Sequence, residues 1–90
     1  MLDRKVTVIN PLGLHARAAA QLVRLANTFR SDIRLKRDDT AVEADAKSIL
    51  NVLHIAASKG VELHIVTNGE DEAEAITAIE ALFTNGFGEI

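Results

Sequence analysis

The sequence predicts an α+β fold, an open-faced sandwich in which a four-stranded, mainly antiparallel sheet carries three helices on one face in the order βαββαβα. Two observations lead to this fold class. Segments with apolar residues at every second position alternate with segments whose apolar residues recur every three or four positions. The 90 residues contain one proline and five glycines, and no Gly/Pro/Ser-rich linker separates the segments. We therefore expect one domain over residues 1–90, with the second face of the sheet left to water.

The first half of the chain supplies three of the expected strands and one helix. Residues 5–9 alternate like a strand that is closed by Asn10-Pro11. Residues 33–36 and 41–43 form the next two, joined by a turn at Asp38-Asp39. A helix is expected over residues 16–29, because apolar side chains there share one stripe: Ala19, Leu22, Val23, Ala26 and Phe29.

The second half supplies two helices and the fourth strand. Residues 47–58 predict a helix with Ser48 as its N-cap, and Val52 and Ile55 suit its core face. Residues 62–67 alternate like a strand that ends at Asn68-Gly69. The last helix is expected from about residue 70 to residue 84, where Asn85-Gly86 stops it. Its inward residues are Ala75, Ile76, Ile79, Leu82 and Phe83.

Composition and charge limit what such a domain can do. Ninety residues allow one modest core and no deep substrate cavity, so any chemistry must be exposed. All ten lysines and arginines lie within residues 1–59 beside six acidic residues, whereas residues 60–90 hold seven acidic residues and no basic one. No cysteine is present. No apolar run approaches the length of a membrane span and no targeting segment is evident, so we expect a cytoplasmic protein without membrane insertion.

The segment Gly13-Leu14-His15-Ala16-Arg17 places a histidine at the threshold of the first helix. The first amides of a helix have no intrahelical partner and favour anions. Arg17 adds a planar guanidinium that can grip two oxygens of one phosphate. A phosphoryl group on His15 would thus be held from two sides. On spacing alone, a histidine at this place is more often a surface residue or an indifferent cap than a phosphate acceptor.

Several motifs in register resemble a known family. They are Pro11-Leu12-Gly13-Leu14-His15-Ala16-Arg17, Lys47-Ser48-Ile49-Leu50, Lys59-Gly60 and Gly69-Glu70-Asp71-Glu72. Together they resemble HPr, the histidine-containing phosphocarrier of the bacterial phosphoenolpyruvate-dependent phosphotransferase system. Residues 43–48 and 81–87 are similar to its nitrogen-related branch, NPr. The resemblance covers nearly the whole chain.

The resemblance implies a carrier rather than a standalone enzyme. His15 would accept a phosphoryl group on Nδ1 from enzyme I and pass it to a IIA domain or a nitrogen-related IIA protein, with Arg17 and the amide of Ala16 stabilising the phosphate. Ser48 matches a regulatory serine, which an HPr kinase/phosphorylase would modify in a host that has one. The family has proline at the position of Ala18, and alanine there leaves the first helical turn less constrained.

A docking patch around His15 is expected next to this chemistry. Its members would be Ala18, Gln21, Arg24, Leu50 and Leu53. Alternatively, both leucines complete the core. His54 would lie at the rim of the patch as a surface residue, and His64 lies on a strand face with no apparent partner. No cofactor and no metal site are expected, because the three histidines lack ligand spacing.

Two other functional classes can be weighed against the carrier. An RNA-binding domain would need aromatic side chains on its strands, and the three phenylalanines lie outside the expected strands, so no nucleic-acid partner is expected. A non-transferring regulatory homologue would dock the same partners without carrying phosphate. His15 speaks against that homologue, and Ala18 keeps it open. We expect a monomer.

Overall fold

The fold has the predicted order of elements. The computed structural model describes residues 1–89. The elements are β1 (Leu2–Thr7), α1 (Ala16–Ala26), β2 (Asp32–Arg37), β3 (Glu43–Asp45), α2 (Ile49–Ile55), β4 (Glu62–Asn68), α3 (Glu72–Thr84) and a short 3₁₀ helix, η1 (Gly86–Gly88). No helix within residues 1–89 is long and apolar enough to cross a membrane.

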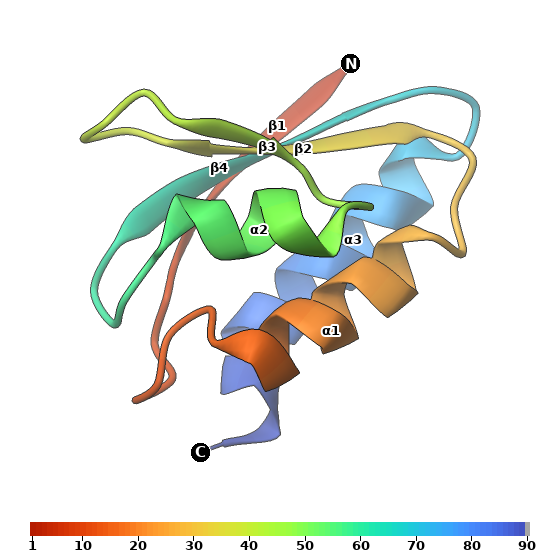
Figure 1. Ribbon diagram of the computed structural model, residues 1–90. Coiled ribbons are helices and arrows are strands. Elements are labelled where there is room, and N and C mark those ends of the chain that lie inside the picture. Colours follow the sequence, from red (N-terminus) through yellow and green to blue (C-terminus); the bar gives the residue numbers. More distant parts are fainter. Residues whose placement is uncertain (90) are drawn as a thin grey trace.

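The sheet is antiparallel throughout, with the strand order β1-β4-β2-β3. The last strand in sequence, β4, lies inside the sheet, where Leu63 pairs with Val6 of β1 and Ile65 pairs with Leu35 of β2. All three helices cover the same face, and the other face carries no helix (Figure 1). The predicted fold class is therefore confirmed.

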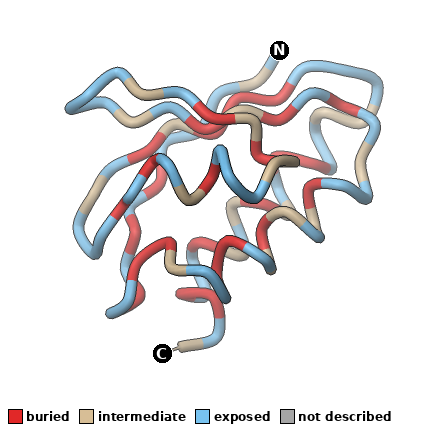
Figure 2. The backbone as a smooth tube through the Cα atoms, viewed as in Figure 1, coloured by how far each residue is buried: buried red, intermediate tan, exposed pale blue. Residues whose placement is uncertain are grey.

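The core lies between the helices and the sheet, where the buried residues gather (Figure 2). Helix α1 packs closely against it because three of its four buried side chains are small: Ala18, Ala19, Leu22 and Ala26. Helix α3 buries Ala75, Ile76, Ile79 and Phe83, while Leu82 is only partly buried. Each large apolar side chain removed from water contributes about 1.5–3 kcal/mol. This burial holds α1 against the sheet.

Several predicted boundaries were wrong. Helix α1 ends at Ala26 rather than at residue 29, because the amides of Thr28 and Phe29 donate to carbonyls three residues back and form a turn. The first strand covers Leu2–Thr7 rather than residues 5–9, because its partner β4 extends to Asn68 and pairs with the chain as far as Leu2. The third strand covers Glu43–Asp45 rather than residues 41–43, since Ala41 has φ 58° and belongs to the turn. Helix α2 ends at Ile55 because Ala56 adopts the left-handed conformation (φ 52°), which ends a helix.

A sharp connection between β1 and α1 sets the position of His15. Gly13 has φ 65°, and a Cβ there would lie 2.4 Å from the carbonyl oxygen of Ala57. Only glycine fits this approach. The next amide, that of Leu14, donates to the same carbonyl at 2.8 Å. The start of α1 is thereby fixed to the segment after α2, and it lies beside the C-terminal end of the chain (Figure 1).

Candidate functional site

His15 occupies the N-cap of α1, as the sequence predicts. Its backbone is extended (φ −72°, ψ 175°), and its side chain makes no capping hydrogen bond. The carbonyl oxygen of His15 accepts the first helical bond from the amide of Ala19 at 2.8 Å. Within residues 1–89 the amides of Ala16, Arg17 and Ala18 donate no hydrogen bond. The ring therefore stands beside a helix end that can receive an anion.

Arg17 is exposed one residue into the helix. In the part of the chain that the structure describes, its guanidinium makes no hydrogen bond and no ion pair. An arginine whose five donors face water can bind two oxygens of an incoming phosphate without first breaking an internal contact. The predicted pairing of His15 with Arg17 at one site is thus geometrically sound.

The two side chains line an open hollow of ≈ 400 Å³. Its walls come from the start of α1 and from the C-terminal segment: Leu12, His15, Arg17, Gln21, Phe87, Gly88 and Glu89. Phe87 fastens that segment to the core, because its ring packs edge-on against Phe83 with 5.0 Å between centroids. Its carbonyl oxygen also accepts a hydrogen bond from Gln21 at 3.3 Å. Leu12, Phe87, Gly88 and Glu89 were not predicted as site residues.

Glu89 contacts the ring of His15 directly. The Nε2 atom of His15 lies 2.6 Å from Oε2 of Glu89, and both side chains are largely buried, with exposed fractions of 26% and 19%. This hydrogen bond, followed by those from Asn10 and from the amide of Leu12, holds the pKa of Glu89 below its usual range. The carboxylate is therefore ionised at neutral pH.

Asn10 donates a hydrogen bond to Glu89 and so helps to fix its carboxylate. The side chain of Asn10 is fully buried, and its Nδ2 donates to the carbonyl oxygen of Gly13 at 2.8 Å and to Oε2 of Glu89 at 2.9 Å. Its Oδ1 is buried without a hydrogen-bond partner in residues 1–89. The amide orientation is thus dictated by two acceptors. The sequence identifies Asn10 only as the residue that ends a strand, and nothing local links it to Glu89.

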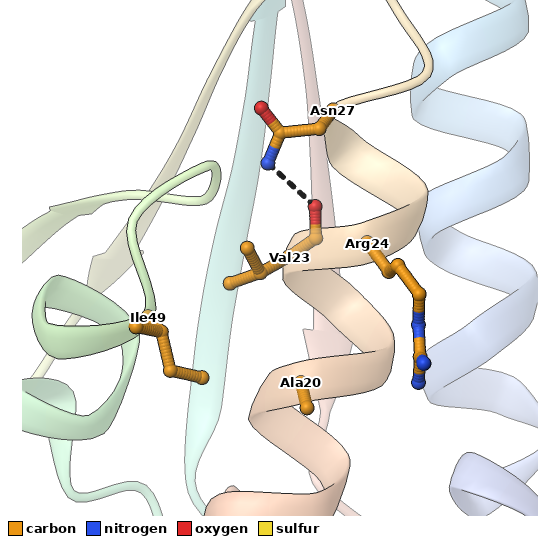
Figure 3. Close-up of a pocket in the computed structure, with 5 residues that line it drawn as sticks. All are labelled: Ala20, Val23, Arg24, Asn27 and Ile49. Carbon is orange, nitrogen blue, oxygen red and sulfur yellow. Dashed lines mark hydrogen bonds between the residues drawn. The ribbon is translucent and has the colours of Figure 1, made fainter.

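A mostly apolar groove of ≈ 410 Å³ runs between α1 and α2 (Figure 3). Val23 of α1 and Ile49 of α2 point toward each other across it, and Asn27 closes one end through a 2.8 Å bond to the carbonyl oxygen of Val23. Of the predicted docking patch, Arg24 lines this groove. Leu50 is exposed by 75%.

Two members of the predicted patch are placed differently. Ala18 is fully buried, so its proposed role in docking was wrong: the residue faces the core because it shares the inner stripe of α1 with Leu22. Leu53 is half-buried and packs against the core, so it is neither a fully exposed docking residue nor a fully buried core residue. Gln21 is half-buried at the wall of the hollow. Leu50 is thus the apolar member whose side chain is free for a partner, and Arg24 is exposed as well.

Ser48 is the N-cap residue of α2, as predicted, but it does not cap. Its side chain makes no hydrogen bond to the first amides of the helix. Its hydroxyl oxygen instead accepts a bond from Nδ2 of Asn51 at 3.1 Å. The expectation that Ser48 satisfies an orphan amide was therefore wrong, and the residue is half-buried rather than hidden.

The other two histidines differ from His15. His54 is exposed and has no hydrogen-bond partner among residues 1–89. His64 on β4 was expected to lack a partner, which was wrong: Nδ1 lies 2.7 Å from Asp3 and Nε2 lies 3.0 Å from Asp38. The hydrogen bond with Asp3 and the charge of both carboxylates raise the pKa of His64. The two carboxylates come from β1 and from the turn after β2, and both segments are distant from His64 in sequence.

Comparison with known proteins agrees with this geometry. The family model for the HPr component phosphorylation site of the PTS matches residues 2–85. The chain belongs to the HPr family. The phosphocarrier protein HPr of Cupriavidus necator is 48% identical over 89 residues, covering 99% of this chain and 98% of the relative. That of Pseudomonas aeruginosa is 45% identical, covering 94% and 93%.

Solved HPr structures share the fold. HPr-C-His from Thermoanaerobacter tengcongensis superposes with a TM-score of 0.93 at 36% identity, covering 100% of this chain and 99% of the other. HPr from Bacillus anthracis gives 0.85 at 35% identity, covering 91% and 95%. This chain is accordingly a phosphocarrier-family protein of the phosphotransferase system. Assignment to the nitrogen-related branch stays a prediction, because these relatives are all named HPr.

Proposed function

We propose that this chain accepts a phosphoryl group from enzyme I on Nδ1 of His15 and passes it to a IIA protein. The observation that carries the proposal is the anion site around His15, formed by three helix amides and the guanidinium of Arg17, none of which has a hydrogen-bond partner among residues 1–89. Phosphoryl transfer depends mainly on positioning and on stabilising charge, so a small open site is sufficient when the partner supplies the remaining surface.

The transfer would proceed by in-line displacement. The lone pair of Nδ1 attacks phosphorus, an N–P bond forms, and the bond between phosphorus and the donor breaks with its electron pair leaving on the donor. The ring keeps its proton on Nε2 and becomes positively charged. Arg17 and the amides of α1 neutralise the phosphoryl oxygens, and the same steps in reverse deliver the group to the next protein.

The partners would bind next to the hollow, on the surface of α1 and α2. The groove between Val23 and Ile49 offers apolar contacts, with Arg24 beside it (Figure 3). The exposed side chain of Leu50 adds apolar surface, and Arg17 adds positive charge. A partner with apolar residues inside an acidic rim fits this surface. We further propose that Ser48, at the start of α2, is a site where phosphorylation would alter partner choice.

Intact mass after incubation with enzyme I and phosphoenolpyruvate tests this function. The parent should gain one phosphoryl mass that is lost in acid and survives alkali, as expected of a phosphoramidate. His15→Ala should abolish the gain completely. His54→Ala and His64→Ala are matched controls that should be labelled as the parent is.

Labelling of His15→Ala would overturn the assignment of the acceptor. Absence of labelling in a folded parent that still binds enzyme I would instead identify the alternative, a regulatory homologue that docks the same partners without transferring phosphate. Light scattering of the same samples tests the predicted monomer, since some solved relatives are described as dimers.

A further inference from the structure

We propose that Glu89, held by Asn10, is a positioning residue that keeps the proton of His15 on Nε2 and so leaves Nδ1 as the only nucleophilic nitrogen of the ring. The inference rests on the proposed function, in which Nδ1 receives the phosphoryl group. It assigns to the C-terminal segment a task in the transfer, beyond packing.

The hydrogen-bond pattern determines the tautomer. An ionised carboxylate can only accept, so the 2.6 Å contact requires His15 Nε2 to donate its N–H to Glu89. A neutral imidazole carries one ring proton. The proton on Nε2 therefore leaves a lone pair on Nδ1, and Nδ1 has no hydrogen-bond partner among residues 1–89. The ring is oriented and its reactive nitrogen is free.

The remaining contacts of Glu89 hold the carboxylate in place. Asn10 donates to Oε2, the oxygen that also faces His15, and the amide of Leu12 donates to Oε1 at 3.4 Å. The two donors come from the loop before α1, so loop, ring and C-terminal segment form one connected unit. The buried Oδ1 of Asn10 has no hydrogen-bond partner within residues 1–89, which is unfavourable. Within these residues, Asn10 lacks a hydrogen bond at Oδ1 because its Nδ2 points at Glu89. A contact that is kept at this cost in stability is consistent with a functional role.

The charge of Glu89 also matters after transfer. A ring that carries a phosphoryl group on Nδ1 and a proton on Nε2 is positively charged, and a carboxylate beside Nε2 favours that state. Of the described residues (1–89) that line the hollow, Arg17 and Glu89 are the titratable ones besides His15. Glu89 therefore balances the ring, while Arg17 is left to balance the phosphoryl oxygens.

Glu89→Gln in the full chain tests the inference, because it keeps the shape of the side chain and removes its charge. In unphosphorylated protein, ¹⁵N–¹H spectra of the histidine rings should show, for the parent, a proton on His15 Nε2 that is protected from exchange with water. In Glu89→Gln that signal should be lost to exchange. With enzyme I and phosphoenolpyruvate at fixed concentrations, the equilibrium ratio of phosphorylated to unphosphorylated protein should fall roughly three- to tenfold, since charge-assisted hydrogen bonds are about twice as strong as neutral ones.

Two controls separate a specific effect from a general one. Glu74→Gln removes the same charge from α3 and should change neither the ring spectrum nor the equilibrium. Glu89→Asp keeps the charge on a shorter side chain and should restore part of the phosphorylated fraction. His54, exposed and unpartnered among residues 1–89, provides the spectrum of an unprotected ring in every sample.

The inference is overturned if the parent carries the His15 proton on Nδ1, or if Glu89→Gln keeps both the protected signal and the parental equilibrium. These outcomes differ from a failure of the proposed function. In that case the parent would not be phosphorylated at all, and the ring spectra alone would still decide the role of Glu89.

Discussion

His15 and His64 are both histidines beside carboxylates, and they differ in how many ring nitrogens are occupied. His64 is bonded through both nitrogens, to Asp3 and to Asp38, on the open face of the sheet. Among residues 1–89, His15 is hydrogen-bonded only through Nε2, to Glu89. A ring that is hydrogen-bonded through both nitrogens has no lone pair left for a substrate. A ring that is hydrogen-bonded through one nitrogen is oriented and still reactive. An acidic neighbour therefore does not distinguish a reactive histidine from a structural one.

The basic side chains near the two rings also differ in whether they form ion pairs. Lys5, a cross-strand partner of His64, forms ion pairs with Asp38 and Glu62. Near His15, Arg17 has no partner within residues 1–89. The start of α1 thus has unsatisfied donors, and the open sheet face has a network of satisfied charges. Unsatisfied groups are the feature that marks the site for an incoming anion.

After the loss of His15 itself, the largest effect is expected at Arg17. Arg17→Lys keeps the positive charge but loses the planar fork, so transfer from enzyme I should slow by the equivalent of one or two charge-assisted hydrogen bonds, roughly 1.5–3 kcal/mol each. Rapid-quench measurement of phosphoryl transfer gives the rate. Lys5→Arg on the sheet face is the matched exchange and should leave the rate unchanged. A lysine variant that transfers at the parental rate would remove Arg17 from the site.

Leu50 and Leu53 test whether the surface beside His15 binds partners. Leu50→Ser should weaken binding of enzyme I in titration calorimetry and alter the free energy of unfolding by less than about 0.5 kcal/mol, because the side chain is already exposed. Leu53→Ser should cost about 1–2 kcal/mol of stability, since its half-buried side chain packs on the core. If Leu50→Ser binds enzyme I normally, the docking surface lies elsewhere.

The sequence predicted the fold and the pairing of His15 with Arg17 because both depend on local signals. Apolar periodicity revealed each helix and strand, and the start of a helix is signalled by residues that are adjacent in sequence. The edges of β1 and β3 were misplaced because pairing with β4 and the φ of Ala41 decide them. Glu89 was missed because it lies 74 positions from His15, and no periodic pattern joins a C-terminal carboxylate to a loop at the opposite end of the chain.

His64 should make a small contribution to stability that depends on pH. Its pKa is raised in the folded protein, so the contribution is fully present below its unfolded value, near 6.5, and is lost as pH rises through the higher folded pKa. In urea unfolding, the stability difference between the parent and His64→Gln should therefore be larger at about pH 5.5 than at about pH 8.5. Asp38→Asn should reduce that difference. An equal difference at both pH values would show that the Asp3 and Asp38 contacts do not persist in solution.

The smallest stability effect is expected at Ser48. An N-cap serine that bonds an orphan amide contributes about 1 kcal/mol, but this hydroxyl bonds Asn51 instead, so Ser48→Ala should cost about 0.5 kcal/mol or less and leave transfer intact. Ser48→Asp should also fold well, because a negative charge is favourable at the start of a helix. That charge lies two residues from Leu50 and would repel an acidic partner, so transfer from enzyme I to His15 should slow. Equal transfer rates for Ser48→Asp and the parent would show that a charge at position 48 influences neither docking nor transfer.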